Sequence, residues 1–257
     1  MQWAARLEQA LDEGRFVLYV QRIDPLGEGA TGLHAEVLIR LLDNDGSLIL
    51  PGAFLPAAER FHMATRIDRW VLTHAVQQIQ DMADLCTLQT LCINLSGQSV
   101  GDRAFHRYAI DVLTEAGSAV CRCICLEITE TAAVTNMADA AIFIEQVRAL
   151  GVRVALDDFG AGASSFGYLK TLKVDLLKID GSFIRDVIDD PLDAAAVRCF
   201  VDVARVVGVK TVAEFVDQPK VLERVREIGI DYAQGYLLHQ PEPIGNLFGA
   251  AALRTPA

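Results

Sequence analysis

The sequence repeats one pattern along most of its length: a short run rich in Val, Ile and Leu, followed by a segment with the apolar spacing of a helix. Strands that alternate with helices in this way indicate βα units and a parallel sheet. Eight runs have the length and composition of strands, the number that closes a (β/α)8 barrel. The pattern therefore predicts an α/β fold of the TIM-like (β/α)8 barrel class. The runs cover residues 15–21, 35–41, 88–96, 123–129, 152–159, 174–180, 209–216 and 232–238.

Helical spacing fills most of the segments between these runs. Glycines stand at the predicted C-terminal ends of four of the helices, at positions 117, 151, 208 and 229, where a stop signal is expected. Residues 1–15 also carry an amphipathic pattern with charges throughout, which is typical of a surface helix and not of a secretion signal. The other predicted helices cover residues 53–83, 103–117, 138–151, 193–208 and 219–229.

Size and composition fit one globular domain. The chain has 257 residues, 52% of them hydrophobic, so it can bury a large core. It contains no linker-like or low-complexity stretch and no apolar run long enough to cross a membrane. We expect a single domain over residues 1–257 in the cytoplasm, either as a lone catalytic domain or as a fragment of a longer signalling protein with regulatory domains.

Charge and cysteine usage exclude several classes of function. The net charge of −11 argues against binding to a nucleic-acid polymer, which depends on basic surface. A ligand that carries phosphate would need a cation to bind here. Cys121, Cys123 and Cys125 alternate along a strand-like run without the spacing of a zinc site, so we expect them to be small buried side chains.

Most of the predicted strands carry one polar side chain near their C-terminal end. Side chains alternate between the two faces of a strand, so each polar group shares its face with the residue two positions earlier. The opposite face is apolar almost throughout, and we expect it to pack against the helices. The polar groups then point into the mouth of the barrel, where enzymes of this architecture place their active sites. They are Glu36, Asn94, Glu127, Asp157, Lys178, Glu214 and Gln234.

Carboxylates dominate this set, and Asp158 directly follows Asp157. Two like charges about 4 Å apart repel by roughly 4 kcal/mol at an effective dielectric near 20, so either some carboxyl groups take up protons or a cation binds. Oxygen ligands without thiolate or imidazole favour a hard divalent ion, Mg²⁺ or Mn²⁺. At the frayed end of a strand, before Gly160, Asp157 and Asp158 can both turn toward neighbouring ions. We interpret the pair as a bridge between two metals.

Two metals roughly 4 Å apart stabilise the attacking and leaving oxygens of phosphoester hydrolysis and acidify a shared water. Lys178 can hold or deprotonate that water, or neutralise the phosphate. A single strand-end carboxylate is more often a helix cap or a surface charge, so only the combination supports a catalytic site. The segment "DDFG" also resembles a kinase motif, but the sequence has neither the glycine-rich loop with its lysine nor the HRD loop of kinases.

These residues lie in a series of segments that resembles the EAL-domain phosphodiesterases, which hydrolyse cyclic di-GMP. The resemblance covers nearly the whole chain and implies a barrel whose first strand runs antiparallel to the others. It also implies hydrolysis of cyclic di-GMP to linear pGpG with two Mg²⁺ or Mn²⁺ ions per site. It rests on "FVLYVQ", "AEVLIR", "INLS", "LEITET", "LDDFGAGASSFGYLKTLKVDLLKID", "TVAEFV" and "YAQGYLL".

The resemblance implies a role for each polar side chain. The second metal would be held by Asp157, Asp158 and waters. Lys178 would interact with the nucleophilic water as the candidate general base, and Gln234 would help to position that water. Glu214 is also assigned to the metal site. The first metal would be held by Glu36, in "EVL" where the family signature reads Glu-Ala-Leu, and by Asn94, Glu127 and Asp157.

Other implied roles lie around this centre. Arg40 would contact a substrate phosphate, and Gln21 would face the guanine side of the pocket. Glu130 resembles the residue that anchors the "DFGAGASSF" loop, which in relatives couples metal binding to dimerisation, so a homodimer is expected. The usual "EGVE" segment is "EFVD" here. We expect Phe215 to face away from Glu214, and Asp217, one methylene shorter than Glu, to reach the site at most through water.

Two other functions stay open beside the enzyme. One is a catalytically silent EAL receptor that binds cyclic di-GMP and acts through a protein partner. The other is a metal-dependent phosphoesterase of similar barrel shape that acts on another nucleotide. Degenerate receptors typically lack one or more metal-site carboxylates, whereas this chain retains the full set. The sequence therefore favours the enzyme.

Overall fold

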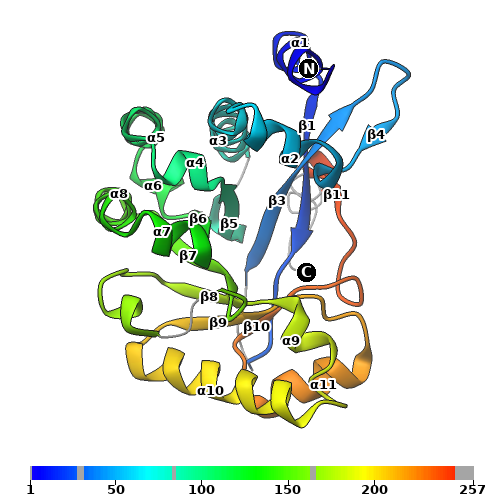
Figure 1. Cartoon of the computed structure of the whole chain (residues 1–257), viewed down its shortest axis with the longest axis vertical. Helices are drawn as coiled ribbons and strands as arrows, with labels where there is room; N and C mark the ends of the chain where they lie inside the picture. Colours follow the sequence, from blue (N-terminus) through cyan, green and yellow to red (C-terminus); the bar gives the residue numbers. More distant parts are fainter. Residues whose placement is uncertain (1, 28–31, 83–84, 163–165, 247–257) are drawn as a thin grey trace.

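A computed structural model describes residues 2–27, 32–82, 85–162 and 166–246 of the chain. Its centre is one strongly curved sheet with the strand order β11-β1-β3-β5-β6-β7-β8-β9-β10-β2, and β4 pairs with β3 at one edge. Helices form an outer layer around this sheet, as Figure 1 shows. The strands are β1 (Phe16–Arg22), β2 (Asp24–Pro25), β3 (Leu33–Leu42), β4 (Leu48–Ile49), β5 (Leu88–Leu95), β6 (Ile124–Thr129), β7 (Arg153–Phe159), β8 (Leu176–Ile179), β9 (Lys210–Ala213), β10 (Tyr232–Ala233) and β11 (Glu242–Pro243).

The direction of the strands confirms the predicted barrel class. From β3 to β10 each neighbouring pair is parallel, whereas β1 pairs antiparallel with β3. The antiparallel first strand was implied by the family resemblance and is confirmed. The sheet curls back on itself because β1 continues, after Ile23, into β2, which pairs antiparallel with β10.

The helices lie where the chain crosses from one parallel strand to the next. Parallel strands need a crossover connection, which is usually a helix; here β7 is the exception, since a segment with a 3-10 turn joins it to β8, and the first helix precedes β1. The helices are α1 (Gln2–Asp12), α2 (Pro51–Arg60), α3 (Ala64–Gln80), α4 (Gly97–Val100), α5 (Arg103–Ala116), α6 (Ser118–Cys121), α7 (Glu130–Thr135), α8 (Met137–Ala149), α9 (Gly181–Arg185), α10 (Pro191–Val207) and α11 (Pro219–Ile228), with 3-10 turns η1 (Leu85–Thr87) and η2 (Phe166–Lys170).

Two separate apolar layers confirm the alternation predicted for the strands. The large core lies between sheet and helices and includes the outward side chains of β6 and β7, such as Leu126 and Val154. The small cluster lies inside the barrel and consists of Ile23, Cys92, Cys125, Ala155, Leu176 and Val212, with Tyr232 packed against it. Five of these six residues and Tyr232 precede a predicted polar residue by two positions. The polar residues therefore stand on the same inner face, one layer nearer the C-terminal ends of the strands.

The predicted helix over 53–83 is wrong as a single element, because the chain breaks it at residues 61–63; residue 83 lies outside the described residues. His62 adopts a left-handed conformation with φ of 56°. The amide of Met63 donates to Ala58 O (2.7 Å) and the amide of His62 to Glu59 O (3.1 Å), the two bonds of a Schellman motif. Glycine usually occupies this position, so a histidine there gave no stop signal.

Two other expectations need correction. The last predicted strand, 232–238, pairs only over Tyr232–Ala233 and then turns, because the backbone of Gly235 lies directly against that of Val216 and leaves no room for a Cβ. Cys121 ends the short helix α6 and Cys123 precedes β6, so the three cysteines do not share a strand face. All three are nevertheless buried, as expected.

Within the described residues, no helix combines the length and the apolar character needed to cross a bilayer. Residues 163–165 of the "DFGAGASSF" loop lie outside the described residues.

Candidate active site

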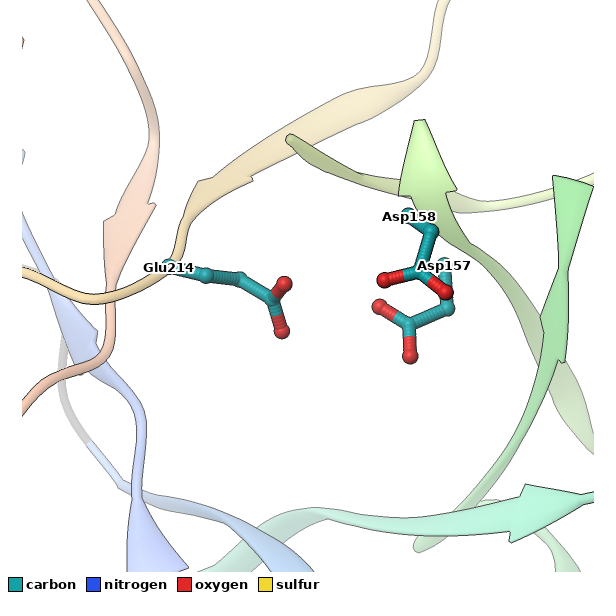
Figure 2. A group of neighbouring side chains, drawn as sticks. All are labelled: Asp157, Asp158 and Glu214. Carbon is teal, nitrogen blue, oxygen red and sulfur yellow. The ribbon is translucent and has the colours of Figure 1, made fainter. Parts of the chain in front are cut away.

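The structure brings the predicted polar residues together at the C-terminal ends of the strands. Neighbouring strands place them in register: Gln21 of β1 is paired with Glu36 of β3, and Asn94 of β5 with Glu127 of β6. Lys178 lies on β8, and Glu214 directly follows β9. Figure 2 shows the side chain of Glu214 reaching across the barrel toward Asp157 and Asp158.

Lys178 is the centre of the arrangement, and its side chain is 1% exposed. Its Nζ lies 2.8 Å from Glu127 Oε2 and 2.9 Å from Glu214 Oε1. It also lies 3.3 Å from Glu36 Oε2 and 3.3 Å from Asp157 Oδ1. One ammonium group therefore contacts four carboxyl groups that come from four different segments of the chain.

Amide side chains hold Glu36 from both sides. Asn94 Nδ2 donates to Glu36 Oε1 at 2.6 Å, and Gln234 Nε2 donates to Glu36 Oε2 at 2.7 Å. Gln234 Nε2 also lies 3.1 Å from Gln21 Oε1, and Gln21 Nε2 donates to the carbonyl of His239 at 2.8 Å. The amides thus link the first strand of the barrel to the last, and the orientation of Glu36 is fixed.

Opposite effects act on the pKa values of Lys178 and Glu36. Burial lowers the pKa of Lys178, but the surrounding carboxylates, Asp157 and Glu127 first among them, outweigh it and raise the pKa well above its ordinary value. Burial raises the pKa of Glu36, but Lys178 and the amide hydrogen bonds outweigh it, and the pKa of Glu36 is lowered. The lysine is therefore held as an ammonium and Glu36 as a carboxylate.

Other carboxyl groups of the cluster resist ionisation. Burial and the neighbouring negative charges raise the pKa of Glu127 well above its ordinary value. Burial, partly opposed by Lys178, raises the pKa of Glu214 to about 8. Burial and the charges of Asp157 and Asp180 also raise the pKa of Asp158. The cluster carries more acid than one lysine can neutralise.

Asp157 and Asp158 face the same centre although they are adjacent in a strand. The pairing of β7 with β8 shifts register between Leu156 and Phe159, and Asp158 has φ of 53°, a left-handed conformation rare outside glycine. Together these features turn Asp158 back toward the side that Asp157 faces (Figure 2). One oxygen each of Asp157, Asp158 and Glu214 lies within 4.8 Å of the others.

The site fits a divalent cation on two grounds. First, Glu127 Oε1 and Gln234 Oε1 are buried and accept no hydrogen bond, and buried Asp157 Oδ1 meets the Lys178 ammonium at 3.3 Å in an ion pair without hydrogen-bond geometry. Buried acceptors without a donor are costly, and a cation would satisfy them. Second, the donor set consists of carboxylate and amide oxygens, which hard ions such as Mg²⁺ and Mn²⁺ prefer. Asp157 and Asp158 are the residues that the resemblance implies for the second metal. Glu214 lies close enough to both to be a third ligand of that metal.

Arg40 and Gln21 lie next to the cluster on its β1 and β3 side. Arg40 stands four residues after Glu36 on the same face of β3, where its guanidinium lies over the ring of Tyr19 at 5.5 Å. Its Nη1 donates to the carbonyl of Ile39 at 2.9 Å. Their roles toward a substrate stay predictions.

Glu130 anchors the segment after β7, as the resemblance implied. Its carboxylate is 1% exposed and accepts hydrogen bonds from the amides of Gly160 (3.1 Å) and Gly162 (3.3 Å) and from the hydroxyl of Tyr168. Burial and this contact raise the pKa of Tyr168. Tyr168 was not singled out in the sequence, where an isolated tyrosine carries no signal.

The two departures in "EFVD" lie away from the carboxylates. Asp217 is exposed, and its Oδ1 accepts a hydrogen bond from the amide of Tyr236 at 2.9 Å, so it holds the turn after β10. Phe215 is 49% exposed and has φ of 53°. Its ring lies against the backbone of Gly181 and under the guanidinium of Arg185, 4.3 Å from the ring centroid. Phe215 therefore packs on α9 and not on Glu214.

Fold and site together define a class of protein: an α/β barrel with an antiparallel first strand, whose mouth gathers carboxylates, amides and a buried lysine from separate strands. A family profile described as the EAL domain matches residues 4–241. The chain belongs to the EAL domain family.

Two relatives illustrate the similarity in sequence. Cyclic di-GMP phosphodiesterase PdeB of Shewanella oneidensis is 39% identical over 244 residues, which are 95% of this chain and 28% of the relative. Cyclic di-GMP phosphodiesterase PdeF of Escherichia coli K12 is 37% identical over 240 residues, 93% of this chain and 32% of the relative. The chain thus spans less than a third of the length of these two curated relatives.

Solved structures confirm the fold. The chain matches the PaMucR phosphodiesterase in complex with c-di-GMP with a TM-score of 0.84 and 32% identity, over 96% of this chain and all of the other. It matches the FimX EAL domain of Pseudomonas aeruginosa bound to c-di-GMP with a TM-score of 0.84 and 27% identity, over 94% of this chain and 97% of the other.

Proposed function

We propose that this chain hydrolyses cyclic di-GMP to linear pGpG with two divalent cations, Mg²⁺ or Mn²⁺. Family membership and the names of its relatives support the reaction class. The observation that supports the metal requirement is the excess of carboxylates around the single Lys178 ammonium, together with the buried Glu127 Oε1, which accepts no hydrogen bond.

The proposed ligands divide into two groups. Glu36, Asn94, Glu127 and Asp157 would hold one cation, and Asp157, Asp158 and Glu214 the other. When bound, the two cations would activate a water and stabilise charge on the phosphodiester oxygens. Asp157 is assigned to both groups because it contacts Lys178 at the centre of the cluster and also lies close to Asp158 and Glu214.

Lys178 has two roles that differ in its protonation state. As an ammonium it donates hydrogen bonds, so it can hold the attacking water or a phosphate oxygen at the centre of the site. It acts as a general base only after the charge of the surrounding carboxylates is neutralised, because those carboxylates are what raise its pKa. Gln234, which already bonds to Glu36, would orient the same water.

The substrate would enter over β1 and β3. The guanidinium of Arg40 would neutralise a phosphate, which the otherwise acidic site needs in order to bind an anion. Gln21 would face a guanine base, whose edge offers hydrogen-bond donors and acceptors to an amide. Asp217, bound to the turn at Tyr236, would act at most by supporting Gln234.

The decisive experiment is a turnover assay with cyclic di-GMP in Mn²⁺ or Mg²⁺, with and without a chelator. We expect pGpG as the product and loss of activity with the chelator. Glu36→Ala should abolish turnover and keep the far-ultraviolet circular dichroism of the folded barrel. Micromolar binding without turnover would favour the receptor, and turnover of other phosphodiesters alone would favour a different substrate.

We further propose that the active form is a homodimer in which Glu130 couples the loop after β7 to the metal ligands. We also propose that the chain acts in the cytoplasm and that a longer protein joins it to regulatory domains. Analytical ultracentrifugation with and without Mn²⁺ tests the dimer, and a monomer under both conditions would contradict it.

A further inference from the structure

A buried carboxylate outside the active site is bound to the chain just beyond one of the proposed ligands. Asp68 lies on α3 and is 8% exposed. Its Oδ2 accepts three hydrogen bonds: from the amide of Ser96 (2.9 Å), from Ser96 Oγ (2.6 Å) and from Ser99 Oγ (2.6 Å). Three donors that converge on one oxygen form a rigid contact between the helix layer and the sheet.

Ser96 is the first residue after β5 and the N-cap of α4, where its Oγ accepts a hydrogen bond from the amide of Ser99. It stands two residues beyond Asn94. Pairing between β3 and β5 ends at Val37 and Ile93, whereas pairing between β5 and β6 continues to Leu95. At Asn94, therefore, the strand is held by β6 on one side, and Asp68 fixes the backbone that follows.

Helix α3, which carries Asp68, is itself held in place by packing. Its buried face, with Leu72 and Ala75 fully inaccessible, packs against the sheet, so Asp68 has little freedom to move. Burial raises the pKa of Asp68, and the bonds from Ser96 and Ser99 oppose that shift. Removal of a partner that hydrogen-bonds directly to a metal ligand typically weakens metal binding about 10- to 100-fold. Asp68 acts one step further out, through Ser96, so a smaller effect is expected.

We propose that Asp68 is a positioning residue of the active site: by holding Ser96 it fixes the end of β5, so that the Asn94 amide stays 2.6 Å from Glu36 Oε1 and ready to serve the first cation. This inference rests on the proposed function, because it concerns the metal site assigned there. Asp68 itself touches neither substrate nor metal.

The test measures Mn²⁺ binding by isothermal titration calorimetry without substrate. We expect Asp68→Ala to weaken Mn²⁺ binding by up to about tenfold, the lower end of the range for direct partners of a metal ligand. Asp68→Asn keeps the shape and one acceptor oxygen, and we expect it to recover most of the affinity. Ser99→Ala removes one of the three donors and should have a smaller effect than Asp68→Ala. In turnover assays the half-saturating Mn²⁺ concentration should shift while KM for cyclic di-GMP stays the same.

A matched control separates positioning from a general loss of stability. Val197→Ala removes buried volume from α10, far along the chain from β5, and is expected to lower Tm without changing Mn²⁺ affinity. Wild-type affinity in Asp68→Ala, or a loss of affinity in Asp68→Ala no larger than that in Val197→Ala, would overturn the inference. If the wild type binds Mn²⁺ but turns over no cyclic di-GMP, the proposed function fails while the positioning role is still measured. A wild type that binds no Mn²⁺ overturns both.

Discussion

At the scale of single residues, the ammonium group of Lys178 offsets part of the repulsion between the carboxylates inside the barrel. Its ammonium contacts Glu36, Glu127, Asp157 and Glu214, and it is as buried as the apolar core. A buried charge is stable only when paired, and removal of one partner leaves the others without compensation. We therefore expect the same lysine to stabilise the fold without metal and to serve the proposed reaction with metal.

Lys178→Met should separate these two needs. We expect kcat to fall about 100-fold or more with little change in KM, because the contact to the attacking water is lost. In chelator, Tm should also fall, and Mn²⁺ should restore most of that loss. Steady-state kinetics and calorimetric melting check both. Lys210→Met, at an exposed ion pair with Asp231, is the control; equal effects in the two variants would contradict the assignment.

The raised pKa of Glu214 leads us to expect that metal binding depends on pH. With its pKa raised to about 8, the carboxyl group of the ion-free fold keeps a proton at neutral pH, which an incoming cation must displace. A folded pKa above the unfolded value also means that this group lowers the stability of the ion-free fold as pH rises toward 8.

We therefore expect the affinity for Mn²⁺ to rise between pH 6 and pH 8 and to level off above it. Calorimetric titrations at several pH values in buffers of different ionisation enthalpy measure both the affinity and the protons released. In Glu214→Gln the rise should be smaller, because this position no longer carries a proton to displace. An affinity that does not change over this range would contradict the prediction.

At the scale of elements, the segment after β7 depends on a neighbouring helix. Glu130, the first residue of α7, binds the amides of Gly160 and Gly162 and the hydroxyl of Tyr168. The segment begins two residues after Asp158, so the contact that orders it also supports the aspartate pair.

Glu130→Ala should destabilise the fold by about 1 to 3 kcal/mol, because it leaves the buried Tyr168 hydroxyl without its acceptor. Urea denaturation measures the free energy of unfolding, and Glu223→Ala, at an exposed position on α11, is the control. A loss below 1 kcal/mol would show that water replaces the carboxylate. Activity should fall further than stability alone explains, since Asp158 loses its support.

The elements also show what could be predicted from the sequence. Apolar periodicity placed most strands and helices within one or two residues, because inner and outer faces follow the period of each element. It failed where backbone conformation decided the outcome. His62 ends α2 in a left-handed conformation usual for glycine. Asp158 has the same conformation, and its turn toward the site was expected from the strand end before Gly160 and not from the periodicity. Such conformations leave no mark on hydrophobic spacing. Asp68 was missed because a lone polar residue in an amphipathic helix looks like surface.

At the scale of the whole molecule, the barrel gathers its acidic residues at the cost of mutual repulsion, and bound cations would relieve it. A ligand that binds the folded state alone adds stability with concentration, about 2.7 kcal/mol at 100 times its Kd. We expect Tm to rise steadily with Mn²⁺ and to return to the starting value on chelation. Asp157→Asn should reduce this rise strongly. A Tm that does not depend on Mn²⁺ would argue against the proposed metal centre.

The split first strand has a consequence for how the molecule reaches its working state. Residues 16–22 pair with β3 early in the chain, but residues 24–25 must wait for β10, which begins at Tyr232. The contact between Gln21 and Gln234 joins residues 213 positions apart, and contacts so distant along the chain form slowly. The amide network around Glu36 therefore cannot be complete before synthesis of the chain has reached Gln234.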